Sequence, residues 1–351
     1  MRLAAGAHTV RLGAFLLAGQ FPGQSQAEAL SAAVDYALAC ERAGFHSAWM
    51  AEHHFIPYGV CPSAMTFAAH VLGRTRRIQV GTAVAILSNR HPVALAEETA
   101  LLDHLSGGRF HLGVGRGGPW VDLEVFGAGF ARYERGFAET LDLLLRWLTS
   151  ERVSAAGEFF SFREVTVVPR PATRPRPPVT VAATSPATAE LAAARGLPLL
   201  LGMHMDDAEK AAMLASYAQV AAQRGDDPAQ TPHLAAVLAY VADSRAEALA
   251  HLRAAMPQWL ERGVGSYVSI DPGGRRCRDL HAYAERLLSI HPIGTAEQCA
   301  ERLATTAERT GIRHFLLMVE GAGSRRRTLG NIARLGAEVI PRLALDTGVR
   351  R

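Results

Sequence analysis

The chain has 351 residues, of which 49% are hydrophobic, so it can bury one large core, and we expect a single α/β domain over residues 1–351. Its net charge of +4 is basic, but the arginines are scattered among acidic residues, so we expect no nucleic-acid surface. The four cysteines lie far apart without metal-ligand spacing. We therefore expect no disulfide, no metal and a cytoplasmic location.

The N-terminal region predicts a strand over residues 10–18. A charge before an apolar run also suits a signal peptide, but Arg11 interrupts this run, which is too short to cross a membrane. No later segment has the pattern of a membrane helix, so we expect no membrane association. A helix over 27–43 then ends at Gly44, and a second strand covers 46–50.

A polar cluster, Glu52-His53-His54, follows the second strand directly. A carboxylate beside two imidazoles can supply a general base and the group that orients it, so all three are candidate catalytic residues. Surface or structural histidines are one alternative, and a metal site is another. Adjacent side chains of an extended segment point to opposite faces, so His53 and His54 cannot easily reach one metal ion.

The next segment predicts two parallel strands joined by a helix. Residues 78–87 are apolar and β-branched, a helix begins at His91-Pro92, and residues 110–114 form a second strand. The glycines that follow complete a GxGxxG pattern from Gly113 to Gly118. No helix follows this pattern directly, so it is a weak dinucleotide fingerprint. It leaves a glycine-lined turn in which Arg116 could contact an anion, or which merely turns the chain.

Strands and helices continue to alternate up to the C-terminus. The other predicted elements are helices over 63–72, 133–150, 187–195, 206–224, 244–262, 280–288, 295–310 and 324–345, strands over 179–182, 197–201, 233–242 and 313–319, a hairpin over 157–168 and a rigid proline-rich connector over 169–178. Eight strands, each followed by helical sequence, favour a (β/α)8 TIM barrel with insertions. Catalytic groups in such a barrel lie at the carboxyl ends of the strands.

One of these strand ends, Thr184-Ser185-Pro186-Ala187-Thr188, also opens a helix. Its hydroxyl and N–H groups suit phosphate binding and ordinary N-capping equally well. Arg132 and Arg135 stand near the start of the helix over 133–150, where a solvated arginine is the default.

Several ordered segments resemble the bacterial luciferase family of flavin-dependent monooxygenases, in particular its catalytic α-subunit. They are AEHHF at 51–55, VGTAVAILSNRHPVALAEETALLDHLSGGRF at 80–110, VFG at 125–127, TVAATSPATAELAAARGLP at 180–198, SYV at 266–268 and HPIGTAEQC at 291–299. The resemblance implies a (β/α)8 barrel that uses reduced FMN and O2 to oxygenate a small organic substrate through a flavin hydroperoxide. It further implies a separate NAD(P)H:flavin reductase and a homodimer formed through helices at 63–73 and 92–106.

The resemblance also assigns roles to single residues. His53 looks like the family's catalytic histidine, with Glu52 and His54 beside it, and Ala83 and Val84 fall where the family has a non-prolyl cis peptide against the flavin ring. The residues that it implies for cofactor binding are Phe15, Glu52, Ala83, Val84, Arg116, Arg135, Thr184, Ser185 and Thr188. Arg116, Ser185 and Thr188 would surround the phosphate. Arg135, or alternatively Arg132, would complete this phosphate site.

The sequence departs from the luciferase pattern at several places. Gly115 replaces a reactive cysteine, which we expect to open room beside the flavin, and Thr184 replaces a glutamate. The segment over 263–293 is shorter than the luciferase lid, which shields the flavin from water. We therefore expect a non-luminescent monooxygenase of secondary metabolism. A deazaflavin-dependent hydride-transfer enzyme and a non-catalytic partner subunit are the alternatives.

Overall fold

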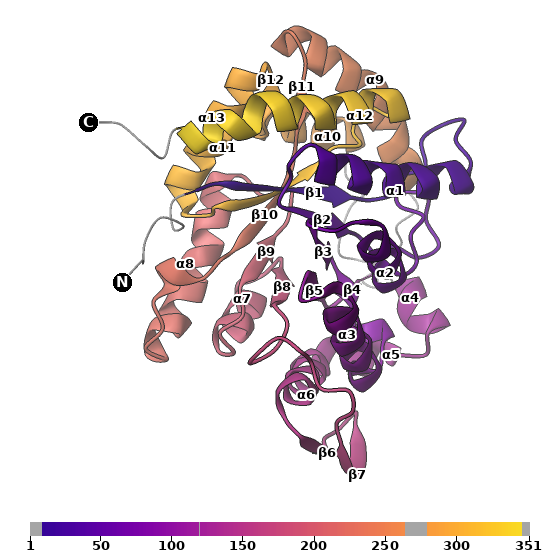
Figure 1. The fold of residues 1–351 in the computed structure, drawn as a ribbon, viewed down its shortest axis with the longest axis vertical. Helices are drawn as coiled ribbons and strands as arrows, with labels where there is room; N and C mark the ends of the chain where they lie inside the picture. The colour runs from indigo at the N-terminus through magenta and orange to yellow at the C-terminus, as the bar shows by residue number, and fades with distance from the viewer. Residues whose placement is uncertain (1–8, 119, 264–278, 346–351) are drawn as a thin grey trace.

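The strands of the computed structural model, which describes residues 9–118, 120–263 and 279–345, form a closed parallel barrel (Figure 1). In the described part of the chain, eight strands follow the order β3-β2-β1-β13-β10-β9-β8-β5, and pairing of β3 with β5 closes the ring. These strands are β1 (Arg11–Leu16), β2 (Ser47–Met50), β3 (Gln79–Thr82), β5 (Phe110–Gly115), β8 (Val179–Ala183), β9 (Leu199–Leu201), β10 (Leu234–Leu238) and β13 (His314–Met318). The predicted TIM barrel is confirmed.

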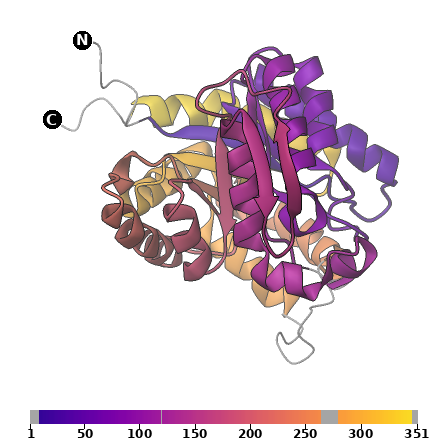
Figure 2. The ribbon, with the colours of Figure 1, turned by 90° about the horizontal axis from the view of Figure 1, so that it is seen from below.

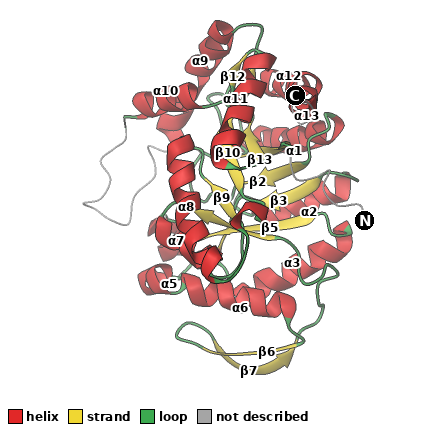
Figure 3. Ribbon diagram, turned by 90° about the vertical axis from the view of Figure 1, so that its left-hand side faces the viewer, coloured by secondary structure: helices red, strands yellow, loops and turns green. Residues whose placement is uncertain are grey.

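Helices surround the barrel (Figure 3). They are α1 (Gln26–Arg42), α2 (Ala64–Arg74), α3 (Pro92–Ser106), α4 (Trp120–Val125), α5 (Gly129–Arg135), α6 (Phe137–Thr149), α7 (Pro186–Ala193), α8 (Asp207–Gln223), α9 (Arg245–Gly263), α10 (Leu280–Ile290), α11 (Ala296–Thr310), α12 (Arg325–Arg334) and α13 (Ile340–Leu345). Capping boxes at Ser25, Asp206 and Thr295 fix the starts of α1, α8 and α11. No helix in the described ranges combines the length and the apolar composition that crossing a membrane requires.

Trp49 of β2 fills the middle of the barrel and is 1% exposed. The neighbouring strand β3 needs a residue without a side chain where it pairs with Trp49, because a Cβ at Gly81 would lie 2.4 Å from the indole Cε3. Trp49, Ala83, Leu200, Leu234 and Leu316 form the buried cluster inside the barrel. The interior is therefore a packed core and not a pore, and catalytic groups in such barrels lie at the carboxyl ends of the strands.

The chain between β3 and α3 is less regular than the predicted strand over 78–87. A cis peptide joins Ala83 to Val84, the short strand β4 (Ala85–Ile86) pairs with β5, and a 3-10 turn (Leu87–Asn89) follows. The expectation that no helix directly follows the glycines up to Gly118 is wrong, because α4 begins at Trp120 and α5 follows it. Helix α4 packs against the 3-10 turn and buries Leu123.

The predicted hairpin over 157–168 is shifted along the chain. It pairs β6 (Arg152–Ala156) with β7 (Ser161–Thr166), and Figures 1 and 2 show it outside the barrel. Residues 157–160 form its turn, because the Glu139 carboxylate accepts hydrogen bonds from the N–H groups of Glu158, Phe159 and Phe160. An anchored turn of this kind is a tertiary effect that strand patterning does not reveal.

Two further differences lie near the C-terminus. The predicted helix over 324–345 is divided by a π-helical turn (Leu335–Val339), where Pro341 cannot donate the usual intrahelical hydrogen bond. The short strands β11 (Tyr240–Val241) and β12 (Ile293–Gly294) pair with each other beyond the barrel. Much of the segment predicted as a shortened lid, residues 264–278, lies outside the described residues.

Candidate functional site

The polar cluster after β2 is anchored through Glu52, which is 5% exposed. Its carboxylate accepts hydrogen bonds from the N–H groups of Ala64 at 3.1 Å and Ile86 at 3.3 Å, and from Arg90 Nη2 at 3.1 Å. Burial alone would raise the pKa of Glu52, but His54, the Arg90 charge and these hydrogen bonds outweigh it and hold the pKa below its usual value. Glu52 is therefore an ionised carboxylate. It joins its own segment to the start of α2 and to the segment from β4 to Arg90 at the carboxyl end of the barrel, which we call the rim.

His54 lies between Glu52 and two aromatic rings. Its Nε2 is 3.6 Å from Glu52 Oε1, which is longer than a hydrogen bond. The ring meets Phe126 edge-on at 4.8 Å between centroids and lies 5.8 Å from Phe55. Phe55 has a φ of 62°, in the left-handed region, and its side chain is 59% exposed. His54 thus faces the rim, where aromatic side chains cover it.

His53 points away from His54, as its place on an extended segment predicts. Its ring packs edge-on against Tyr58 at 5.1 Å, and a Cβ at Gly59 would lie 2.6 Å from Nδ1. That buried Nδ1 has no hydrogen-bond partner among the described residues. Burial, helped by the nearby His54, lowers the pKa of His53 to about 4. At neutral pH the ring is uncharged and can accept a proton.

The Ala83–Val84 cis peptide lies at the end of β3, which pairs with β2, the strand that precedes the His53 segment. The predicted room at Gly115 is absent: a Cβ there would lie 2.6 Å from Val84 Cγ2, so the Val84 side chain already occupies that space. The expectation that Gly115 opens space beside a flavin is wrong. Gly115 instead allows the valine of the cis peptide to lie against β5.

An apolar surface remains accessible at the carboxyl end of the barrel. Phe15 of β1, Val84 and Ala182 of β8 are partly buried and pack on the cluster around Trp49. These three side chains come from segments far apart in the sequence. They form a floor on which a flat, largely apolar ring system could rest.

Two groups suited to an anion follow the neighbouring strands β5 and β8. The guanidinium of Arg116 lies over the rings of Phe137 at 5.2 Å and Tyr133 at 5.9 Å, and Ser88 Oγ donates a hydrogen bond to the Arg116 carbonyl. After β8, Ser185 caps α7, and its hydroxyl lies 3.1 Å from that of Thr188, which is buried. Thr184 is exposed. The Ser185 hydroxyl accepts the Thr188 N–H at 3.4 Å, so the N-capping predicted for this strand end is present.

The other two arginines have protein partners. Arg135 is 59% exposed and pairs with Glu158 of the hairpin turn. Arg132 donates hydrogen bonds to the carbonyls of Leu87, at 3.1 Å, and Arg90. Arg135 would have to leave Glu158 to reach a phosphate, whereas Arg132 stabilises the loop that precedes α3.

One buried carboxyl at the rim was missed by sequence reasoning. Glu320 follows β13, is 3% exposed, and its Oε2 accepts the Leu17 N–H at 2.6 Å. The N–H groups of Ala18 and Gly19 also favour its charged form, in a turn where Ala18 has a φ of 50°. Burial dominates and raises the pKa of Glu320 to about 7. A lone Glu after an apolar strand was the only signal in the sequence.

Comparison with known proteins identifies the family. The profile of the luciferase-like monooxygenases matches residues 10–314. The chain belongs to this family. The alkanal monooxygenase alpha chain of the Kryptophanaron alfredi symbiont is 28% identical to it over 351 residues, which cover 95% of this chain and 98% of that protein.

Solved structures agree with this assignment. The monooxygenase RslO1 from Streptomyces bottropensis has a TM-score of 0.83 at 25% identity and covers 94% of this chain and 99% of its own. Two further proteins share the fold, each at a TM-score of 0.76. An F420-dependent secondary alcohol dehydrogenase is 18% identical, and the match covers 95% of this chain and 99% of that one. The oxygenating constituent of a Pseudomonas putida 3,6-diketocamphane monooxygenase, solved with FMN, is 17% identical, and the match covers 95% of this chain and 98% of that one.

The residues at the rim fit a cofactor of the kind that luciferase-like monooxygenases use. A flavin or deazaflavin presents a flat ring system and an anionic phosphate, and this barrel offers an apolar floor with an arginine and a helix start on neighbouring strands. No group of three or more His, Cys, Asp or Glu side chains in the described ranges could hold a metal.

Proposed function

We propose that this protein is a non-luminescent monooxygenase that uses reduced FMN and O2 to oxygenate a small organic substrate in secondary metabolism. A separate NAD(P)H:flavin reductase in the cytoplasm would supply the reduced flavin. The shorter segment between α9 and β12 supports a reaction other than light emission, because luciferases need a long lid.

One arrangement supports this proposal best. Four consecutive strands of the barrel, β2, β3, β5 and β8, each end in one of the expected groups. In that order, they bear the Glu52-His53-His54 cluster, the Ala83–Val84 cis peptide, Arg116, and Ser185 with Thr188. Such a row suits a long cofactor whose ring lies near His53 and whose phosphate lies near Arg116.

The roles of the protein groups follow from this geometry. Reduced FMN, when bound, supplies the electrons that activate O2. The uncharged His53, with its unpartnered Nδ1, would accept a proton from the organic substrate or from the cofactor. Glu52 keeps this segment in place through its three loop contacts, and the apolar floor excludes water from the ring.

Rapid mixing tests the proposal. The protein is loaded anaerobically with reduced FMN and mixed with O2, and spectra are recorded in the stopped-flow instrument. We expect a species distinct from both reduced and oxidised FMN, with altered decay in His53→Gln. Direct reoxidation without such a species would contradict the proposal. Titration with reduced F420 alongside FMN tests the deazaflavin alternative, because a hydride-transfer enzyme would bind F420 in preference.

The proposed homodimer has a candidate surface on α3. Leu101 and Leu105 lie one turn apart on this helix and are 51% and 75% exposed. A second copy of the chain packing α2 and α3 against them would bury both. Gel filtration should give a dimer for the native protein and a monomer for Leu105→Asp, and an unchanged elution volume would argue against this surface.

A further inference from the structure

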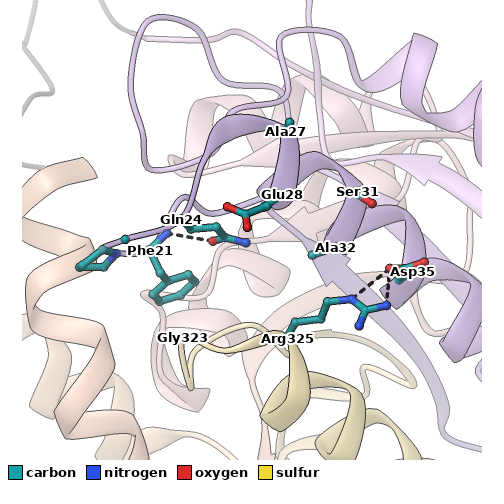
Figure 4. A pocket seen from close by; sticks show the side chains of 11 residues that line it. Phe21, Gln24, Ala27, Glu28, Ser31, Ala32, Asp35, Gly323 and Arg325 are labelled. Carbon is teal, nitrogen blue, oxygen red and sulfur yellow. Dashed lines mark hydrogen bonds and ion pairs between the residues drawn. The ribbon is translucent and has the colours of Figure 1, made fainter.

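Two contiguous cavities lie between α1 and the loop that follows β13. The outer cavity has a volume of about 610 Å³ and opens to solvent. Arg325 of α12 and Asp35 of α1 both line it, and Figure 4 shows the two side chains paired; their ion pair measures 2.7 Å. The two cavities have five lining residues in common, which are Phe21, Gln24, Ala32, Gly323 and Arg325.

The inner cavity is small and polar. Its volume is about 10 Å³, close to the least that one water molecule requires. A buried water also needs two to four polar partners. The hydroxyl-bearing residues Tyr36, Ser324 and Thr328 line this cavity together with Glu320.

The charged groups around Glu320 come from two helices. Asp35 and Tyr36 belong to α1, while Arg325 belongs to α12 and pairs with Asp35. The loop after β1 contributes main-chain N–H groups that face the Glu320 carboxyl. Burial, together with the Glu320 charge, raises the pKa of Tyr36 to about 12, so its hydroxyl remains protonated near neutral pH and can donate a hydrogen bond. A water at this point would therefore meet both a donor and an acceptor.

We propose that the inner cavity binds one water molecule and that this water, through the outer cavity, exchanges protons between the Glu320 carboxyl and bulk solvent. In one transfer, the carboxyl gives its proton to the buried water as that water passes one of its own to water in the outer cavity. Glu320 becomes a carboxylate, the buried water is regenerated, and one proton reaches solvent. The route passes between α1 and α12, through the barrel wall and not through the mouth of the site.

A high-resolution crystal structure of the unsubstituted protein tests the water site. We expect one ordered water within hydrogen-bond distance of Glu320 and of the Tyr36 or Thr328 hydroxyl. A cavity without solvent density would overturn the proposal. The crystals need no flavin, so this result is independent of monooxygenase activity.

Titration tests the exchange route in the flavin-free protein. Glutamate labelled with ¹³C at the side-chain carboxyl is incorporated, and the Glu320 NMR signal is assigned by its loss in Glu320→Gln. Ala32→Val places a larger side chain between the cavities and excludes water, so the carboxylate loses solvation and its titration midpoint should rise by about one pH unit. Its proton exchange should also become slower.

Ala33→Val is the matched control, because Ala33 is equally buried on the same helix but lines neither cavity. It should titrate like the unsubstituted protein. Thr328→Val removes a hydroxyl at nearly constant volume and is the second cavity variant if Ala32→Val does not fold. It too should raise the titration midpoint of Glu320. Midpoints and exchange rates that stay unchanged in these cavity variants would overturn the proposal.

Discussion

The Glu320 carboxylate accepts the Leu17 N–H at 2.6 Å, and this bond joins the end of the last barrel strand to the end of the first. The two residues are 303 positions apart. The bond places a carboxyl with a raised pKa at the same rim as the Glu52-His53-His54 cluster. The rim thus contains one carboxyl whose pKa is raised to about 7 and one buried histidine that is uncharged at neutral pH.

Glu320→Gln should change how stability depends on pH. The pKa is raised from 4.5 unfolded to about 7 folded, so the stabilisation from the neutral carboxyl is complete below pH 4.5 and is lost as pH rises through 7. The variant has no charge to bury, so its stability relative to the unsubstituted protein should improve by on the order of 3 kcal/mol between pH 4.5 and pH 8. Urea unfolding at several pH values measures this, and a constant difference would contradict it.

Acid should destabilise the protein through its buried histidines. Burial lowers the pKa of His111, at the opposite end of the barrel, to about 4 from 6.5. A lowered pKa gives stability that is complete above pH 6.5 and is lost as pH falls towards 4. In His111→Phe the slope of unfolding free energy between these pH values should decrease by up to about 1.4 kcal/mol per pH unit. An unchanged slope would refute this role for His111.

Arg116 and Arg135 should differ in their effect on FMN binding. Arg116→Met removes the guanidinium that lies over the Tyr133 and Phe137 rings, and we expect FMN to bind about 10-fold to 100-fold more weakly. Arg135→Met removes an exposed partner of Glu158 and should leave the Kd within about twofold. Quenching of flavin fluorescence on binding gives the Kd of FMN for each variant. The reverse order would assign the phosphate to Arg135.

Glu52→Gln should destabilise the rim by about 3 kcal/mol, because it leaves Arg90 without its buried partner and weakens the hydrogen bonds from Ala64 and Ile86. Glu98→Gln is the control: the same Arg90 contacts this exposed carboxylate at 3.4 Å, and its loss should cost under about 0.5 kcal/mol. Thermal unfolding at pH 7 compares them. Equal effects would show that the Glu52 contacts do not stabilise the fold.

Gly81→Ala should destabilise the protein by about 1–3 kcal/mol, since the new methyl group would lie 2.4 Å from Trp49. Gly73→Ala should do the opposite and add about 0.5–1 kcal/mol, because Gly73 lies in α2 with no atom near its Cβ position. Chemical denaturation distinguishes the two. A neutral Gly81→Ala would mean that Trp49 can move.

The sequence by itself determined the barrel and the general position of the site. Alternation of strand and helix patterns depends on local periodicity, which is written in the order of residues, and it identified all eight barrel strands seen in the described chain. The cluster Glu52-His53-His54 and the arginine Arg116 were recognisable because they directly follow predicted strands. Local patterning placed the hairpin over 157–168 only approximately, because the contacts of Glu139 decide where its turn lies.

Only the tertiary structure decided which groups meet. The space expected at Gly115 is filled by Val84 from another strand, and Arg135 turns to Glu158 of the hairpin. Glu320 acquired its raised pKa from burial between segments at both ends of the chain. Desolvation and side-chain packing depend on contacts between residues distant in sequence, so no local pattern contains them.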